Sequence, residues 1–112
     1  METKWSNEVD FALTLCDKEG KITHMNNVSK ETFMKYGGEE LNGQSLFDCH
    51  HEPAATLLAR MLTSQEKNVY TIEKNGKKKL IYQCPWYENG IYMGFAELSF
   101  VLPTDMPHYI RK

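Results

Sequence analysis

Four consecutive residues, Cys49-His50-His51-Glu52, carry side chains that can bind a metal ion. Imidazole is a good ligand for iron and zinc, so His50 or His51 could hold haem or a metal ion if this segment folds inward. The side chains of adjacent residues diverge, however, and therefore rarely all converge on one ion. We favour a structural role, in which one histidine caps the backbone and the other is solvated, and we keep haem or metal binding as the alternative.

The other reactive side chains lack the sequence context of a catalytic or metal site. Cys16, Cys49 and Cys84 are widely spaced and include no CxxC pair, which argues against a closed zinc site and a secreted disulfide scaffold. GxSxG, phosphate-loop and HExxH motifs are all missing from the sequence. The sequence therefore does not predict an enzyme, and it predicts three free thiols in a reducing compartment.

A basic run, Lys77-Lys78-Lys79, lies close to Lys74. Such a run could bind nucleic acid, but Glu73 is nearby and the net charge of the chain is −2, so no global field attracts DNA, RNA or an anionic membrane. We interpret the run as a solvated stretch that protects the edge of a sheet from unwanted pairing.

Length and composition indicate one ordinary globular domain. The chain has 112 residues, of which 41% are hydrophobic and 25% charged, so there is no room for an output domain beside a full core. No apolar run approaches the roughly 20 residues of a membrane span, and the polar N-terminus lacks the apolar stretch of a signal peptide. We therefore expect a cytoplasmic protein that acts through a partner.

The first half of the chain is predicted to form a β-hairpin followed by short helices. The apolar pattern indicates strands at residues 11–16 and 21–25. Asn26-Asn27 offers an N-cap for a helix that runs to about Tyr36. A further helix follows Pro53, because apolar residues recur there at helical spacing: Leu57, Leu58, Met61 and Leu62.

The second half is predicted to be strand throughout, at residues 68–74, 77–87 and 91–102. Asn75-Gly76 and Asn89-Gly90 join these strands, and Asn-Gly is the pair that type I′ hairpin turns favour. Hairpins pair their strands antiparallel, so the fold class is α+β, an antiparallel sheet with short helices on one face. Both faces of the last strand are largely apolar, so the face away from the helices needs a cover.

This order of elements resembles the PAS domain. The motifs that carry the resemblance are Asp17-Lys18-Glu19-Gly20-Lys21-Ile22, then Asn26 followed by Ser29, Phe33 and Tyr36-Gly37, then Glu40-Leu41-Asn42-Gly43-Gln44-Ser45. Phe47-Asp48-Cys49-His50-His51 and Met106-Pro107-His108 are similar to the "C-H" variant of some bacterial PAS proteins. The resemblance covers residues 11–102, between an N-terminal lead of residues 1–10 and a C-terminal tail of residues 103–112.

The resemblance implies a five-stranded sheet of order 2-1-5-4-3 with ligands held between one face and the helices. PAS domains generally sense a small molecule, a cofactor or a redox state, although many only dimerise. The reactive cysteine of the flavin photosensor branch would fall at Leu46, which cannot form the adduct. The axial histidine of the oxygen-sensing haem branch would fall at Leu58. Both cofactors are therefore disfavoured, and the cofactor stays unknown.

By the same resemblance, the helices cover the face of the last strand that carries Phe95, Glu97 and Ser99. Glu97 is then a carboxylate in apolar surroundings, so it must be paired or uncharged. It could bind a polar group of a ligand, but we favour pairing with Lys, Arg or a backbone amide. The implied pocket residues are Phe33, Tyr36, Leu57, Met61, Tyr70, Ile72, Ile81, Gln83, Phe95, Glu97 and Ser99.

The opposite face of the last strand is expected to form a homodimer interface through Tyr92, Leu98 and Phe100, with Trp5 from the lead. The alternative is that the lead alone covers this face. Our leading hypothesis is a PAS-type sensor module that dimerises, binds a small ligand and regulates a signalling or transcription partner. The alternatives are a haem- or metal-bearing redox or gas sensor that uses His50 or His51, and a ligand-free dimerisation module.

Overall fold

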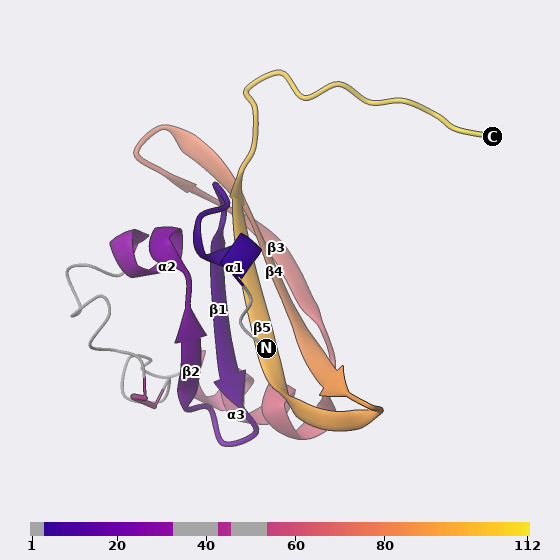
Figure 1. Ribbon diagram of the computed structural model, residues 1–112. Coiled ribbons are helices and arrows are strands. Elements are labelled where there is room, and N and C mark those ends of the chain that lie inside the picture. The colour runs from indigo at the N-terminus through magenta and orange to yellow at the C-terminus, as the bar shows by residue number, and fades with distance from the viewer. Residues whose placement is uncertain (1–3, 33–42, 46–53) are drawn as a thin grey trace.

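The computed structural model describes residues 4–32, 43–45 and 54–112. The elements are α1 (Lys4–Asn7), β1 (Ala12–Asp17), β2 (Ile22–Met25), α2 (Asn27–Thr32), α3 (Ala54–Ser64), β3 (Asn68–Lys74), β4 (Lys77–Glu88) and β5 (Ile91–Val101) (Figure 1). The strands form one antiparallel sheet of order β2-β1-β5-β4-β3. The predicted α+β class and the sheet order are therefore confirmed.

Both Asn-Gly pairs form the tight turns that the sequence predicts. Asn75 and Gly76 have φ angles of 53° and 74°, and Asn89 and Gly90 have φ angles of 53° and 81°. Positive φ at both central residues is the requirement of a type I′ turn, whose twist matches that of the strands it joins. These two turns connect the three long strands β3, β4 and β5, which are neighbours in the sheet.

The N-terminal part is tied together by Asn26, which is fully buried. Its side-chain oxygen accepts a hydrogen bond from the backbone N–H of Ser29 at 3.0 Å, so it caps α2 as predicted. Its amide donates to the carbonyl of Ser6 at 2.9 Å. Ser6 belongs to α1, a short helix that the sequence pattern did not predict. The continuation of the predicted helix to Tyr36 lies outside the described residues.

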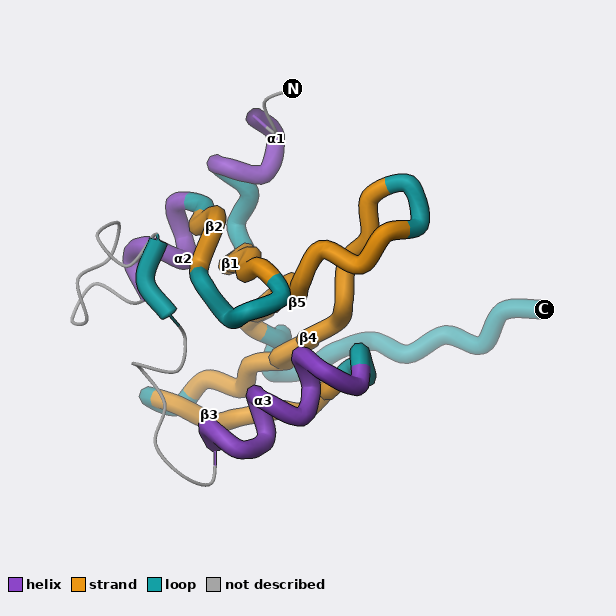
Figure 2. Tube along the Cα trace, turned by 90° about the horizontal axis from the view of Figure 1, so that it is seen from below, coloured by secondary structure: helices purple, strands orange, loops and turns teal. Residues whose placement is uncertain are grey.

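Residues that face each other across antiparallel strands lie on the same side of a sheet, which assigns the two faces. Cys16 of β1 is opposite Phe95 of β5, and both pack with Met61 and Leu62 of α3 in the core. Helix α2 lies on the same side, next to β2 (Figures 1 and 2). We call this side of the sheet the helix-facing side and the other the outer side.

A bulge near the start of β5 changes the alternation of its side chains. Tyr87 is opposite Tyr92, but Trp86 is opposite Gly94, so Met93 is an extra residue in β5. Gly94 has a φ of 144°, a conformation that only glycine adopts readily. Side chains before the bulge therefore face the opposite side of the sheet from the one that simple alternation along β5 would give them.

The bulge places Tyr92 on the helix-facing side. Its ring packs edge-on against Phe95 with centroids 6.4 Å apart, and its hydroxyl donates to the backbone carbonyl of Leu62 at 2.8 Å. The prediction that Tyr92 belongs to a dimer face is therefore wrong. Strict alternation along β5 misplaced it, because the extra residue reverses the side on which Tyr92 lies.

No helix in the described parts of the chain is long and apolar enough to cross a membrane. Residues 103–112 follow β5 without regular structure and are exposed along their whole length. This tail leads away from the sheet (Figure 1).

Candidate functional site

A row of polar side chains crosses the helix-facing side of the sheet at one level. Asn68 of β3, Gln83 of β4, Glu97 of β5 and Thr14 of β1 are consecutive cross-strand partners. The Asn68 amide donates to the Gln83 side-chain oxygen at 3.0 Å, and the Gln83 amide donates to Glu97 Oε2 at 2.7 Å. The hydroxyl groups of Thr14 and Ser29 are hydrogen-bonded at 2.5 Å, which attaches α2 to the end of this polar row.

The hydrogen bonds donated by Asn68 and Gln83 run along the polar row toward Glu97. Among the described residues, Gln83 is the only hydrogen-bond partner of the Glu97 carboxylate, which leaves Oε1 able to accept a further bond. We expected Glu97 to pair with Lys, Arg or a backbone amide. This expectation is wrong, because the partner of Glu97 is the side-chain amide of Gln83. A half-buried carboxylate with a free acceptor can bind a hydroxyl, amine or amide group.

Tyr70 adds a hydroxyl to the neighbourhood of the polar row. Burial and, next, the negative charge of Glu97 raise the pKa of Tyr70, while a hydrogen bond with Gln83 lowers it. The net shift is upward, so the phenol stays protonated at neutral pH and can donate as well as accept. Tyr70 is 41% exposed, which makes its ring accessible from the helix-facing side.

The predicted apolar walls differ in how deeply they are buried. Met61, Ile81 and Phe95 are buried core residues. Leu57 and Ile72 are 39% and 37% exposed, so the core does not fill the space beside them. Ser99 lies opposite Ile81, one level above the polar row on the same side. The structure thus brings together most of the predicted pocket residues on one side of the sheet.

Four candidate residues lie outside the described residues, namely Phe33, Tyr36, His50 and His51. Their roles in a pocket or in haem or metal binding stay predictions. Within residues 4–32, 43–45 and 54–112, His, Cys, Asp and Glu side chains form no group of three or more that could hold a metal ion.

The described cysteines have the chemistry of structural thiols. Burial is the main cause that raises the pKa of both Cys16 and Cys84. A raised pKa keeps a thiol protonated at neutral pH, and the protonated form is a poor nucleophile and a poor metal ligand. Cys16 therefore serves the core that it shares with Phe95.

Sequence reasoning missed Asn68 and the pair of Thr14 and Ser29. A usable signal exists for Asn68, because counting outward from the Asn75-Gly76 turn places it opposite Gln83. The link between Thr14 and Ser29 joins a strand to a helix and has no comparable signal in the sequence.

The outer side of the sheet carries the remaining dimer-face candidates. Leu98 and Phe100 are half-buried, and the ring of Phe100 lies 4.9 Å from that of Phe11, which precedes β1. Trp5 is 68% exposed. Phe11, just after the lead, thus covers part of this side, while Trp5 of the lead is left at the surface.

No family model matches this sequence, and no curated protein matches it either. Several solved structures share its fold. The PAS domain of the histidine kinase ThkA has a TM-score of 0.64 at 17% identity, with 82% of this chain and 99% of that chain covered. The Vibrio cholerae Aer2 receptor, described as a dual PAS-heme oxygen sensor, has a TM-score of 0.61 at 17% identity, with coverages of 83% and 95%.

A sensory box sensor histidine kinase from Vibrio cholerae is similar over even more of the chain. Its TM-score is 0.64 at 12% identity, with 92% of this chain and 90% of that chain covered. Similarity at such low identity reports on the fold, not on the ligand. The element order, the sheet order and these neighbours agree, and this chain therefore has the PAS fold.

Proposed function

We propose that this protein is a cytoplasmic PAS-type sensor module that binds a small ligand between the helix-facing side of its sheet and its helices. It forms a homodimer and regulates a signalling or transcription partner. The observation that carries the proposal is the polar row, in which hydrogen bonds from Asn68 and Gln83 lead to Glu97. A core that served packing alone would have little use for a carboxylate there, because a half-buried charge is costly unless it is paired.

The chemistry of the polar row indicates what kind of ligand fits. Glu97 presents a negative charge and a free acceptor oxygen, and Tyr70 presents a hydroxyl beside it. Apolar surface from Ile72 and Leu57 is accessible on the same side. The ligand would therefore combine an apolar body with a hydroxyl, amine or other donor group that reaches Glu97.

The ligand part of the proposal is tested by native mass spectrometry of the purified protein and by thermal shifts with a metabolite library. We expect a bound small molecule, or a compound that raises the melting temperature. The Glu97→Gln substitution removes the charge and keeps the shape of the side chain. It should lower the affinity for that compound about tenfold, since charge-assisted hydrogen bonds contribute roughly 1.5–3 kcal/mol.

The matched control is Glu88→Gln at the exposed end of β4, which should leave affinity unchanged. A protein that carries no small molecule, and whose melting temperature no compound raises, would contradict ligand binding. Equal affinity in the Glu97→Gln variant would contradict the role of the polar row. A Soret band in the purified protein would contradict a haem-free ligand and favour the haem-bearing alternative.

The dimer part of the proposal concerns Leu98 and Phe100 on the outer side. A lysine at Leu98 would place a charge in the centre of the proposed apolar interface, where burial of a charge is costly. We expect the wild-type protein to sediment as a dimer and the Leu98→Lys variant as a folded monomer. Ile110→Lys, in the exposed tail, is the control and should remain a dimer. A monomeric wild-type protein, or an unchanged mass for Leu98→Lys, would show that this interface is wrong.

A further inference from the structure

The tip of the β3–β4 hairpin gathers positive charge on one side of the sheet. Lys74 and Lys77 are direct cross-strand partners beside the Asn75-Gly76 turn, and Lys79 is two residues further along β4. Alternation puts these three lysines on the helix-facing side. Lys78 lies on the outer side, opposite Glu73. The basic run of the sequence is therefore divided by the strand, with three lysines on one side and one on the other.

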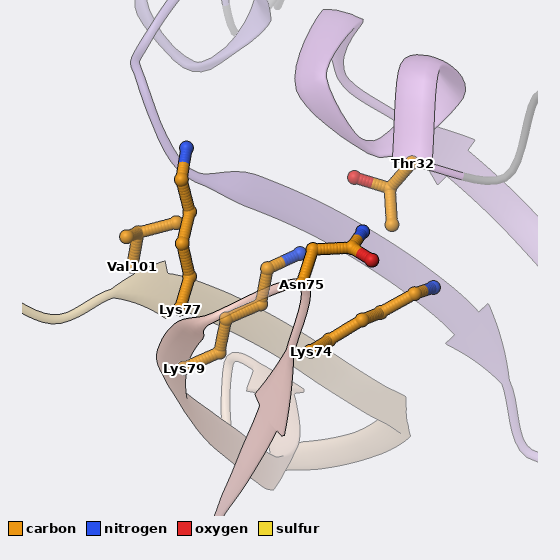
Figure 3. Close-up of a pocket in the computed structure, with 6 residues that line it drawn as sticks. All are labelled: Thr32, Lys74, Asn75, Lys77, Lys79 and Val101. Carbon is orange, nitrogen blue, oxygen red and sulfur yellow. The ribbon is translucent and has the colours of Figure 1, made fainter.

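The three lysines surround a cavity. It has a volume of about 320 Å³, is open to solvent, and is lined by Thr32, Lys74, Asn75, Lys77, Lys79 and Val101. Figure 3 shows side chains of the hairpin ending on the side that faces Thr32, the last residue of α2. This volume is within the range of small-molecule sites in proteins.

All the charged side chains that line this cavity are positive. Among the described residues, Lys74, Lys77 and Lys79 form no ion pair with a carboxylate. Like charges directly opposite on neighbouring strands are destabilising, so the pair of Lys74 and Lys77 opposes the hairpin that holds it. An anion between the ammonium groups would turn this repulsion into attraction.

The polar groups of the cavity favour an anion over a neutral ligand. The Thr32 hydroxyl donates its hydrogen to the carbonyl of Val28 at 2.8 Å, so the remaining donors at the rim are the three ammonium groups and the Asn75 amide. Lysine binds phosphate as a point charge, and several together bind a dianion better than a monoanion. Val101 provides an apolar wall.

We propose that this cavity, the hairpin pocket, binds a small organic dianion such as a phosphate monoester or a dicarboxylate. This site is separate from the polar row, because Lys79 is four residues, or about 13 Å, from Gln83 along β4. Loss of ligand binding at Glu97 would therefore not affect anion binding in the hairpin pocket. Loss of anion binding in the hairpin pocket would likewise not affect ligand binding at Glu97.

The test is a titration followed by the backbone amide resonances of Thr32, Asn75 and Gly76 in NMR spectra. Glycerol phosphate and succinate are the two probes, and sodium chloride at equal ionic strength is the reference. We expect saturable shifts with at least one dianion and none with chloride. Stronger binding of glycerol phosphate assigns the site to phosphate esters, and stronger binding of succinate assigns it to dicarboxylates.

Matched variants separate a defined site from general attraction. Lys77→Gln and Lys79→Gln should each lower the affinity for the dianion about three- to tenfold. Lys78→Gln, on the outer side of the same strand, should change this affinity by less than about twofold. All three residues lie in a surface hairpin, so these substitutions should leave the protein folded. The NMR spectrum of each variant shows whether it is folded. Shifts that do not saturate, or equal losses in all three variants, would overturn the proposal.

Discussion

Replacing Gly94 with alanine is expected to lower the free energy of unfolding by at least 3 kcal/mol, or to prevent folding. A Cβ on Gly94 would overlap the backbone carbonyl oxygen of Cys16 and would lie 2.8 Å from the Cα of Asp17. These are backbone atoms of the paired strand β1, so no side chain can turn away to make room. The φ of 144° adds strain of about 1–3 kcal/mol for a residue with a side chain.

Urea unfolding followed by circular dichroism measures this effect. Gly90→Ala is the matched control, because Gly90 also has a positive φ, of 81°, but nothing lies within 4 Å of its added Cβ. We expect Gly90→Ala to cost about 1 kcal/mol, from backbone strain alone. A Gly94→Ala variant as stable as Gly90→Ala would contradict the close approach of β1 and β5 at the bulge.

Replacing Asn26 with alanine is expected to lower the free energy of unfolding by about 3–5 kcal/mol. The Asn26 oxygen accepts from the backbone N–H groups of Leu13 and Ser29, each at 3.0 Å, and its amide donates to the carbonyls of Ser6 and Phe11, each at 2.9 Å. Alanine would remove the cap of α2 and leave several buried backbone groups without a partner. Each such group costs about 1–3 kcal/mol.

Two variants at neighbouring positions sharpen this measurement. Asn27→Ala changes an exposed residue of the same type and should shift stability by less than about 0.5 kcal/mol. Asn26→Asp keeps the acceptors for Leu13 and Ser29 but loses both donors, so it should also be strongly destabilising. If Asn26→Asp were as stable as wild type, the link from Asn26 to the carbonyls of Ser6 and Phe11 would be wrong.

The sheet was predictable because its signals are local. Each Asn-Gly pair defines a turn and thereby the pairing of the strands on either side, so β3, β4 and β5 are found within one residue of their observed ends. The N-cap at Asn26 is likewise a property of a few consecutive residues. Helix α1 was not predictable, because four residues are too few to show a period and Ser6 is held by a residue 20 positions away.

The candidate site was predictable only in part. The resemblance to the PAS domain implied that Phe95, Ile81 and Met61 line one pocket, and the structure brings them together on the helix-facing side. The link between Gln83 and Glu97 was not predictable. Counting back from the Asn89-Gly90 turn without a bulge pairs Gln83 with Ala96, whereas the observed partner is Glu97.

By itself, the sequence determined the class of fold, the order of the strands along the chain and the turns that join them, because these depend on residues close together in the chain. The tertiary structure alone decided the extra residue at Met93, and with it the polar row and the position of Tyr92. The physical reason lies at Gly94. The close approach of β1 leaves no space for a side chain there, and this contact joins residues almost eighty positions apart.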